Sequence, residues 1–377
     1  MGNLGELRHD LGRARQIARV MARHGFAPFL RRVPGLGRLI SSHDERTPTE
    51  PVEVRFCLML EELGPTFVKL GQILSMRSDL LPLAFTRELS RLQDQVPPVP
   101  FADVRLQIER GLGRPLDELF ASVDENPLAS ASIAQVHAAR LGDGADVVVK
   151  VQRPGIAHEI RADASILLLL ARLLELVLEE FATYRVHDLA QEFERGLLAE
   201  LDFTSEAQNL RAFRAFNQDR EGVYVPRVFD ELCCRTVVTM ERVWGRRISD
   251  LAAEEDQERT RSVVERLVLV NFEHIFVDGM FHADPHPGNV LVREDGSIAF
   301  IDMGLMGRLA RDTQDRMLIL LLAITLRDAD TLARVLVRVG DANRRVQLHE
   351  FRDAIRRLLD RYLGLAVGAV DSSSVLA

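Results

Sequence analysis

The stretch at residues 281–304, FHADPHPGNVLVREDGSIAFIDMG, constrains the fold of this chain more than any other. It has a hairpin pattern in which two short apolar runs flank the turn residues EDGS. Because such a hairpin brings its ends together, we expect Asn289 and Asp302 to lie on neighbouring strands near Asp284. Carboxylate and amide oxygens suit Mg²⁺, and the alternative is a loop whose Asp and Asn side chains only cap turns.

Length and composition are those of a globular protein with two or more domains. The chain has 377 residues, of which 47% are hydrophobic and 28% are charged. The net charge of −8 argues against a general nucleic-acid-binding protein, although residues 1–38 carry eight Arg and only two acidic residues. The three Cys show no metal-ligand spacing or disulfide framework, which favours a reducing cytosol. The chain shows no signal peptide and no apolar run long enough to span a bilayer, so we expect no transmembrane segment.

Lysine is rare in this chain. Only Lys69 and Lys150 occur among 48 basic residues. A lysine that persists where arginine is otherwise used is a candidate for a site that needs a compact, flexible ammonium group. Chance survival is the alternative explanation, so the positions of the two lysines decide between the two readings.

The pattern along the chain predicts helices, then a small sheet, then a second helical lobe. Apolar spacing predicts helices at residues 1–32, 52–78, 101–122, 159–182 and 187–217, with linkers at 34–51 and 243–247. Strands are expected on both sides of a turn at residues 142–144, and again at 223–229 and 236–241. The resulting domains are a basic helix and linker (1–48), a helical extension (49–126), a lobe with the small sheet (127–243) and a helical lobe with the loops described above (244–377).

The order of the polar motifs matches phosphoryl-transfer chemistry. Protein kinases combine a strand lysine, the catalytic loop H-R-D-x-x-x-x-N and the metal-binding D-F-G. Here Lys150 ends the run VVVK. The sequence His282-Ala283-Asp284 is followed by Asn289, five residues after Asp284, and Asp302-Met303-Gly304 follows the hairpin. Each match alone is weak, but their joint order across about 150 residues is specific.

Two carboxylates compete as the partner of Lys150. Glu200 and Glu206 are six residues apart on an expected helix, which places them about 240° apart around its axis. Only one of them can therefore face Lys150.

The glycine-rich loop of protein kinases is missing. The equivalent position reads Ala129-Ser130-Ala131-Ser132-Ile133-Ala134. Since only glycine lets the backbone approach phosphates so closely, the added methyl groups should change which nucleotide binds best. An ordinary protein kinase is therefore disfavoured.

With these motifs the chain resembles the UbiB (AarF/UbiB) family of atypical kinases from about residue 49 onward. The marks are the K-x-G-Q motif at Lys69–Gln72, the alanine-rich loop, the E-x-D motif at Glu200-Leu201-Asp202, and the sequence HADPHPGN at residues 282–289. The resemblance implies an α+β, two-lobed protein-kinase-like fold with an N-terminal helical extension over the active site. Many bacterial members continue beyond the point where this chain ends, so we expect a truncated or naturally short form.

The resemblance also implies residue roles. Lys69 and Gln72 would lie in helices that cover the position where a protein kinase admits a peptide, with Glu200 and Asp202 meeting them. Glu206 would be the partner of Lys150, and Asp284 the catalytic-loop acid. The metal ligands would be Asn289 and Asp302, with Met303 as an apolar plug in place of the usual Phe. The nucleotide, ATP or ADP with Mg²⁺, would contact Lys150, the alanine-rich loop (Ala129, Ser130, Ala131, Ser132, Ile133 and Ala134), Met240 and Glu241.

Family members act as ATPases or small-molecule kinases that support the biosynthesis of ubiquinone or related isoprenoid lipids. The expected partners are therefore adenine nucleotide and an isoprenoid or quinone-type lipid or membrane surface, without nucleic acid. A homodimer, a complex with lipid-biosynthesis enzymes and peripheral attachment of a cytoplasmic chain to the inner face of the membrane stay open. A phosphotransferase of the aminoglycoside or choline kinase type also carries H-x-D-x-x-x-x-N but lacks K-x-G-Q, and a pseudokinase-like binding module is disfavoured because no metal or phosphate residue is missing.

Overall fold

The computed structural model describes residues 3–32, 49–78, 80–92, 96–177, 185–251, 257–282, 287–339 and 347–363. The chain divides into two compact units. The first unit is formed by Met1–Gln208 and Arg227–Arg242, and the second by Asn209–Pro226 and Val243–Ala377. Residues 209–226 belong to the second unit and residues 227–242 to the first, so both units are formed by more than one stretch of the chain.

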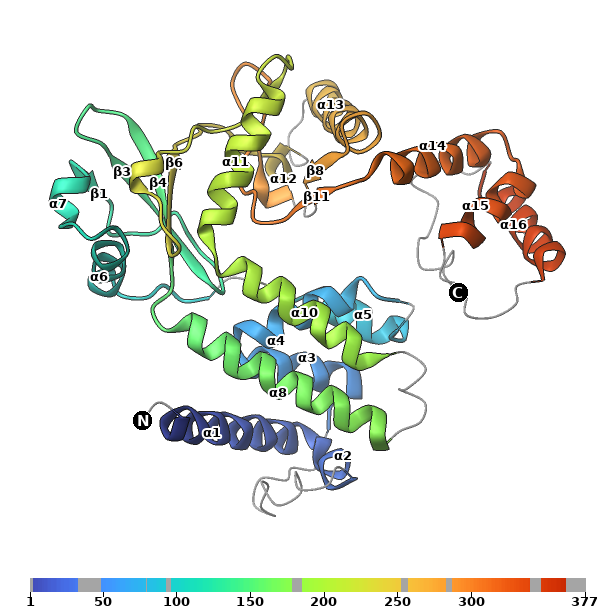
Figure 1. Cartoon of the computed structure of the whole chain (residues 1–377), viewed down its shortest axis with the longest axis horizontal. Helices are drawn as coiled ribbons and strands as arrows, with labels where there is room; N and C mark the ends of the chain where they lie inside the picture. The colour runs from blue at the N-terminus through green and yellow to red at the C-terminus, as the bar shows by residue number, and fades with distance from the viewer. Residues whose placement is uncertain are drawn as a thin grey trace. The chain divides into compact units, whose positions relative to one another are not determined.

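The first unit is mainly helical outside its sheet (Figure 1). Its helices are α1 (Asn3–Met21), α2 (Ala27–Arg32), α3 (Val52–Leu63), α4 (Pro65–Ser75), α5 (Leu83–Leu89), α6 (Phe101–Leu112), α7 (Leu116–Leu119), α8 (Ile156–Val177) and α10 (Val186–Glu200). Helix α11 (Phe203–Asn217) is the element in which the chain passes from the first unit to the second. The expected linker at residues 34–51 falls mostly outside the described residues.

Three long helices expected from the sequence are each divided in two. At Gly64 the backbone has a φ of +97°, a conformation that glycine adopts readily, and Pro65 then opens α4. Gly113, with a φ of +71°, ends α6 in the left-handed conformation, so residues 101–122 do not form one helix. The third break is at Asp202, whose Oδ1 accepts hydrogen bonds from the backbone N–H and hydroxyl of Thr204 and so starts α11.

The sheet of the first unit is antiparallel and five-stranded. Its strands are β1 (Ser122–Val123), β2 (Ala129–Ser130), β3 (Ala134–Arg140), β4 (Asp146–Gln152) and β6 (Val237–Glu241). The order is β1-β3-β4-β6, and β2 pairs with β3. Because side chains alternate along a strand, Val147, Val149 and Val151 of β4 point to one face and Lys150 to the other.

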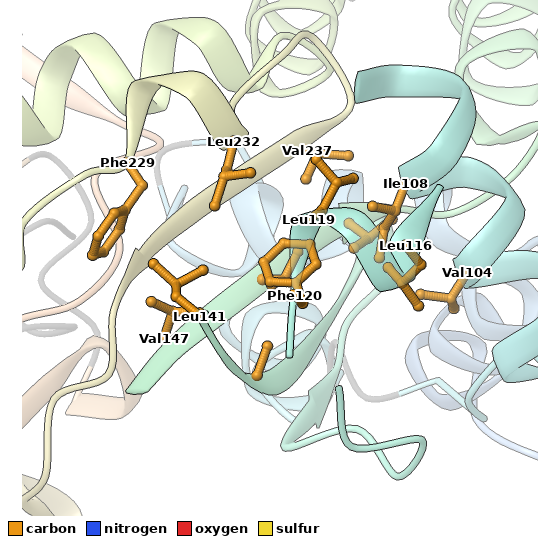
Figure 2. Packing of buried hydrophobic residues seen from close by; sticks show 13 residues of the cluster. Val104, Ile108, Leu116, Leu119, Phe120, Leu141, Val147, Phe229, Leu232 and Val237 are labelled. Carbon is orange, nitrogen blue, oxygen red and sulfur yellow. The ribbon is translucent and has the colours of Figure 1, made fainter. Parts of the chain in front are cut away.

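The valine face of β4 is covered by α6 and α7. Figure 2 shows this core, in which Val147 and Val237 of the sheet belong to one buried cluster with Ile108 of α6 and Phe120, just after α7. Val147 and Val237 are fully buried, so β4 and β6 are held rigidly at the centre of the sheet.

A second core joins α1, α3, α4, α5 and α8. Ile17 and Val20 of α1 are buried in it with Leu60 and Leu89. A buried ion pair accompanies this packing: Arg13 contacts both oxygens of Asp163 on α8, at 2.6 and 2.9 Å, and the Asp163 side chain is fully buried. The apolar face of the basic N-terminal helix therefore packs against other helices of the same unit.

The second unit contains two small sheets and a set of helices. Its strands are β5 (Val223–Tyr224), β7 (Arg246–Arg247), β8 (Met280–His282), β9 (Val290–Val292), β10 (Ile298–Phe300) and β11 (Met306–Arg308). Its helices, after the end of α11, are α12 (Ile248–Leu251), α13 (Gln257–Glu273), α14 (Arg311–Thr325), α15 (Ala329–Val339) and α16 (Leu348–Tyr362). One sheet has the order β5-β10-β9-β7 and the other pairs β8 with β11.

Two sequence-based predictions about these strands have opposite outcomes. The hairpin at residues 289–301 is confirmed, since β9 and β10 pair antiparallel with Val290 opposite Phe300. The strand expected at residues 223–229 is wrong in length, because only β5 forms, and it pairs parallel with β10 instead of joining the small sheet of the first unit. Val228 makes only an isolated bridge to Met240 of β6.

Among the described residues, no helix is both long enough and apolar enough to cross a membrane.

Candidate functional site

Lys150 and Glu206 form a two-point ion pair in the first unit. Lys150 Nζ lies 2.7 Å from Oε1 and 2.9 Å from Oε2 of Glu206. The Glu206 side chain is almost fully buried and that of Lys150 is 14% exposed. Lys150 Nζ also lies 5.5 Å from the centre of the Phe203 ring. The prediction that Glu206 and not Glu200 pairs with Lys150 is confirmed.

The premise behind that prediction was wrong. Glu200 and Glu206 do not share a helix, because α10 ends at Glu200 and α11 begins at Phe203. Leu201 is buried at this junction, and Asp202 caps the new helix. The chain therefore turns between the two carboxylates, and each meets a different lysine.

Lys69 is the lysine that meets Glu200. Its Nζ lies 3.2 Å from Glu200 Oε1, and both side chains are partly buried, so the expected pairing is confirmed. Asp202 was expected to join them, but its carboxylate caps α11 at Thr204 and lies 3.9 Å from Arg235 Nε. The need to satisfy free N–H groups at the start of α11 explains this different role.

The glycine of the K-x-G-Q motif permits close packing of α4. A Cβ atom on Gly71 would lie 2.3 Å from Leu92 Cδ1 and 2.8 Å from Leu60 Cδ1. Both leucines are buried, so they have no room to move away. Gln72, one residue on, donates from Nε2 to the carbonyl of Leu92 at 3.3 Å. These contacts fix the helix that carries Lys69.

The alanine-rich loop is a strand–turn–strand segment. Ala129 and Ser130 form β2, the N–H of Ala131 donates to the carbonyl of Ala134 at 2.9 Å, and β3 then begins at Ala134. Ser132 is buried and Ile133 is partly exposed within the turn. Ser130 Oγ accepts a hydrogen bond from Arg153 at 3.1 Å, which ties the loop to the end of β4.

Met240 and Glu241 end β6, the strand next to β4. Met240 is buried, and the Glu241 carboxylate accepts a hydrogen bond from the N–H of Arg227 at 3.1 Å. Their expected contact with adenine stays a prediction.

In the second unit the hairpin brings Asn289 and Asp302 together. The N–H of Ile301 donates to the carbonyl of Asn289 at 3.1 Å. Asp302 directly follows Ile301, so its backbone lies close to that of Asn289. The Asp302 Oδ1 atom accepts from the N–H of Gly304 at 2.9 Å. Met303 is fully buried, as expected for an apolar plug. An amide oxygen and a carboxylate suit a hard cation such as Mg²⁺.

His282 connects the catalytic-loop sequence to the metal motif. Its Nε2 donates to the carbonyl of Asp302 at 2.5 Å, and β8 pairs with β11 so that His282 lies opposite Met306. Asp284 lies outside the described residues, so its role stays a prediction. Among the residues that are described, no three His, Cys, Asp or Glu side chains lie close enough together to form a metal-ligand cluster. The expected ligand pair is one Asn and one Asp, so only Asp302 could belong to a cluster of these four residue types.

Sequence reasoning overlooked Asn209. Its Nδ2 donates to the carbonyl of Met303 at 3.0 Å, although the two residues are 94 positions apart. The available signal was its spacing, three residues after Glu206, which places both side chains on one side of α11.

A strand lysine held by a helix carboxylate, together with a hairpin that joins an Asn to a metal-motif Asp, defines a protein-kinase-like protein. Residues 91–336 match the ABC1 atypical kinase-like domain. The chain belongs to this UbiB/ABC1 family of atypical kinases.

Relatives and a solved structure agree with this assignment. The chain is 41% identical over 321 residues to a probable protein kinase UbiB of Azotobacter vinelandii, covering 84% of this chain and 60% of that protein. It is 34% identical over 367 residues to an uncharacterized protein of the hydrogenase 1 5′ region of Clostridium pasteurianum, covering 97% of this chain and 66% of that protein. The structure of Rv3197 from Mycobacterium tuberculosis in complex with erythromycin is 27% identical and has a TM-score of 0.58, over 81% of this chain and 77% of that one. The chain thus spans less than two thirds of the length of the curated relatives it matches.

Proposed function

We propose that this protein is an atypical kinase or ATPase that binds adenine nucleotide with Mg²⁺ and supports the biosynthesis or handling of ubiquinone or a related isoprenoid lipid. The observation that carries the proposal is the pair of Lys150 with the buried carboxylate of Glu206. In a chain with two lysines, one has this partner and the other, Lys69, has Glu200.

Each candidate residue has a separate role in phosphoryl transfer under this proposal. The Lys150 ammonium binds the α- and β-phosphates, and Glu206 keeps it oriented by accepting two hydrogen bonds. Asn289 and Asp302 supply oxygen ligands for the metal, and Asp284 orients the attacking group. When bound, Mg²⁺ neutralises charge on the phosphate oxygens.

The K-x-G-Q helix separates this proposal from an ordinary protein kinase. Helix α4 is fixed through Lys69, Gly71 and Gln72, and the same motif is absent from the aminoglycoside and choline kinase type. We therefore expect little phosphorylation of peptides and none of aminoglycosides. A peptide-library assay that finds robust phosphorylation by the unmodified protein would contradict this expectation.

The test of the proposal is metal-dependent nucleotide binding. Calorimetry should detect binding of Mg-ATP or Mg-ADP to the unmodified protein and its loss in Asp302→Asn. Asp295→Asn is the matched control, because Asp295 lies in the turn of the same hairpin and caps Ser297. Binding of Mg-nucleotide by Asp302→Asn as strong as that of the control would refute the site.

A second assay addresses the lipid. ATP hydrolysis should rise when liposomes containing anionic lipid and a quinone-precursor mimic are added. Hydrolysis that is identical with and without these liposomes would restrict the proposal to nucleotide binding and turnover.

A further inference from the structure

Asn209 contacts the metal motif through a main-chain carbonyl. Because a carbonyl can only accept, the Asn209 side chain must present its Nδ2 donor to Met303, at 3.0 Å. The position of Asn209 is itself fixed, since one turn later α11 buries Phe213 against Phe300 of β10, with ring centres 5.5 Å apart. The donor is therefore delivered by a helix that packs on the hairpin.

The carbonyl held by Asn209 belongs to the same peptide group that holds the Asp302 carboxylate. The C=O of Met303 and the N–H of Gly304 form one planar unit, so fixing one end fixes the direction of the other. The N–H of Gly304 donates to Asp302 Oδ1 at 2.9 Å. The fit is close, because a Cβ on Gly304 would lie 3.2 Å from that oxygen.

His282 restrains the backbone at Asp302 itself. Its Nε2 donates to the Asp302 carbonyl, which fixes the peptide after Asp302. The His282 bond and the Asn209 bond therefore hold two successive peptide groups, and the Asp302 Cα that carries the carboxylate lies immediately before the first of them. Without Asn209, the second peptide could rotate and release Asp302 Oδ1.

We propose that Asn209 is a positioning residue for the metal-binding carboxylate of Asp302, acting through the Met303–Gly304 peptide group. This inference rests on the proposed function, in which Asp302 binds Mg²⁺. Glu206 lies three residues earlier on α11, about 60° around the helix. One helix thus carries both the partner of Lys150 and the residue that orients the metal ligand.

The first test measures the loop itself and needs no metal or nucleotide. In Asn209→Leu, which keeps the number and branching of the side-chain heavy atoms but removes the donor, hydrogen–deuterium exchange at the Gly304 amide should rise by about tenfold or more, while the amides of β9 and β10 keep their protection. Gln208→Leu, at an exposed neighbouring position of α11, is the control. Unchanged exchange at Gly304 in Asn209→Leu would overturn the inference.

The second test measures metal affinity. Mn²⁺ titration of the nucleotide-bound protein, followed by electron paramagnetic resonance, should show a loss of about 10- to 100-fold in Asn209→Leu, the usual effect of removing a group that orients a metal ligand. Nucleotide affinity without metal should stay within about twofold of the unmodified protein, whereas a general loss of structure would lower both. Equal loss of both affinities, or no loss of metal affinity, would contradict the positioning role.

Two further variants keep the outcomes separate. Asn209→Asp has nearly the same shape but presents only acceptors to the Met303 carbonyl, so it should weaken Mn²⁺ binding at least as much as Asn209→Leu even if the leucine variant folds poorly. If Asp302→Asn abolishes metal binding and both Asn209 variants retain it, the inference alone is wrong. If Asp302→Asn also retains it, the proposed function is wrong.

Discussion

Lys150 donates hydrogen bonds to both oxygens of Glu206, at 2.7 and 2.9 Å, from the centre of an antiparallel sheet. Removing one partner of such a pair leaves an uncompensated buried charge. We expect Glu206→Ala to lower the free energy of unfolding by about 3 kcal/mol. Denaturant unfolding should show this loss and a change within about 0.5 kcal/mol for Glu192→Ala, at an exposed position of α10.

A double variant shows whether Glu206→Ala is destabilised by an unpaired buried charge or by lost packing. Lys150→Met combined with Glu206→Leu should recover most of the stability lost in Glu206→Ala, because neither charge is then buried alone. A double variant as unstable as the single one would show that the loss is due to packing.

The alanine-rich loop is expected to select between nucleotides. Ala131→Gly should let the backbone approach the phosphates more closely and change the ratio of ATP to ADP affinity by on the order of threefold to tenfold, or about 1 kcal/mol. Ala121→Gly, at an exposed position just before β1, should leave the ratio unchanged. Calorimetric titration with both nucleotides measures the effect, and equal ratios in all three proteins would dismiss the loop as a selectivity element.

Gly71 is expected to be intolerant of a side chain. In Gly71→Ala the new methyl group would lie 2.3 Å from Leu92 Cδ1, so we expect a destabilisation of about 1–3 kcal/mol from overpacking. Gly12→Ala on α1 meets no atom within 4 Å and should stabilise that helix by about 0.5–1 kcal/mol. Opposite signs of the two changes in thermal unfolding are the expected result, and a stabilised Gly71→Ala would show that α4 is packed more loosely than described.

Stability is expected to depend on pH through His274. Burial lowers the pKa of His274 from 6.5 to about 4, with a smaller contribution from Arg220, and its Nε2 bonds to Asn217 at 2.8 Å. Because the unfolded chain takes up this proton near pH 6.5 and the folded chain does not, the stabilisation is complete above pH 6.5 and is lost as the pH falls toward 4. Between pH 7.5 and pH 5 the loss is about 2 kcal/mol.

Variants assign that loss to one side chain. His274→Gln should reduce the difference in unfolding free energy between pH 7.5 and pH 5, measured by denaturant titration, while His349→Gln at an exposed position of α16 should not. The same pH difference in both variants would assign the effect to other groups.

The basic N-terminal helix is expected to attract anionic lipid only through its charges. Ile17 and Val20 are buried, whereas Arg15 and Arg19 are exposed on the other face of α1. Each basic residue near an anionic surface contributes about 1 kcal/mol, and the effect fades beyond the Debye length of about 10 Å at 0.1 M salt. Arg15→Glu/Arg19→Glu should therefore reduce co-sedimentation with anionic liposomes at low salt.

Charge reversal is a cleaner test than deletion of residues 1–38, which would also remove Arg13 and expose the buried Asp163. Arg110→Glu/Arg114→Glu, at exposed positions around the end of α6, is the control for net charge. Equal co-sedimentation of both double variants would eliminate α1 as a lipid contact.

Local sequence signals were sufficient to predict the hairpin between Asn289 and Asp302 and the strand that carries Lys150. The hairpin turn between Asn289 and Asp302, and the run of three valines that precedes Lys150, act over a few residues, so their geometry follows from short-range rules. The same short-range reading failed where apolar spacing continues across a break. Gly64-Pro65 and Leu201-Asp202 divide helices that periodicity alone had joined.

The sequence by itself therefore singled out the candidate residues: the two lysines, the carboxylates expected to pair with them and the expected metal motif. Only the tertiary structure decided which of them meet and what holds them. Asn209 reaches Met303 across 94 residues and Arg13 reaches Asp163 across 150. Such contacts depend on how helices and sheets pack on one another, and side-chain burial, not local propensity, supplies the free energy for that packing.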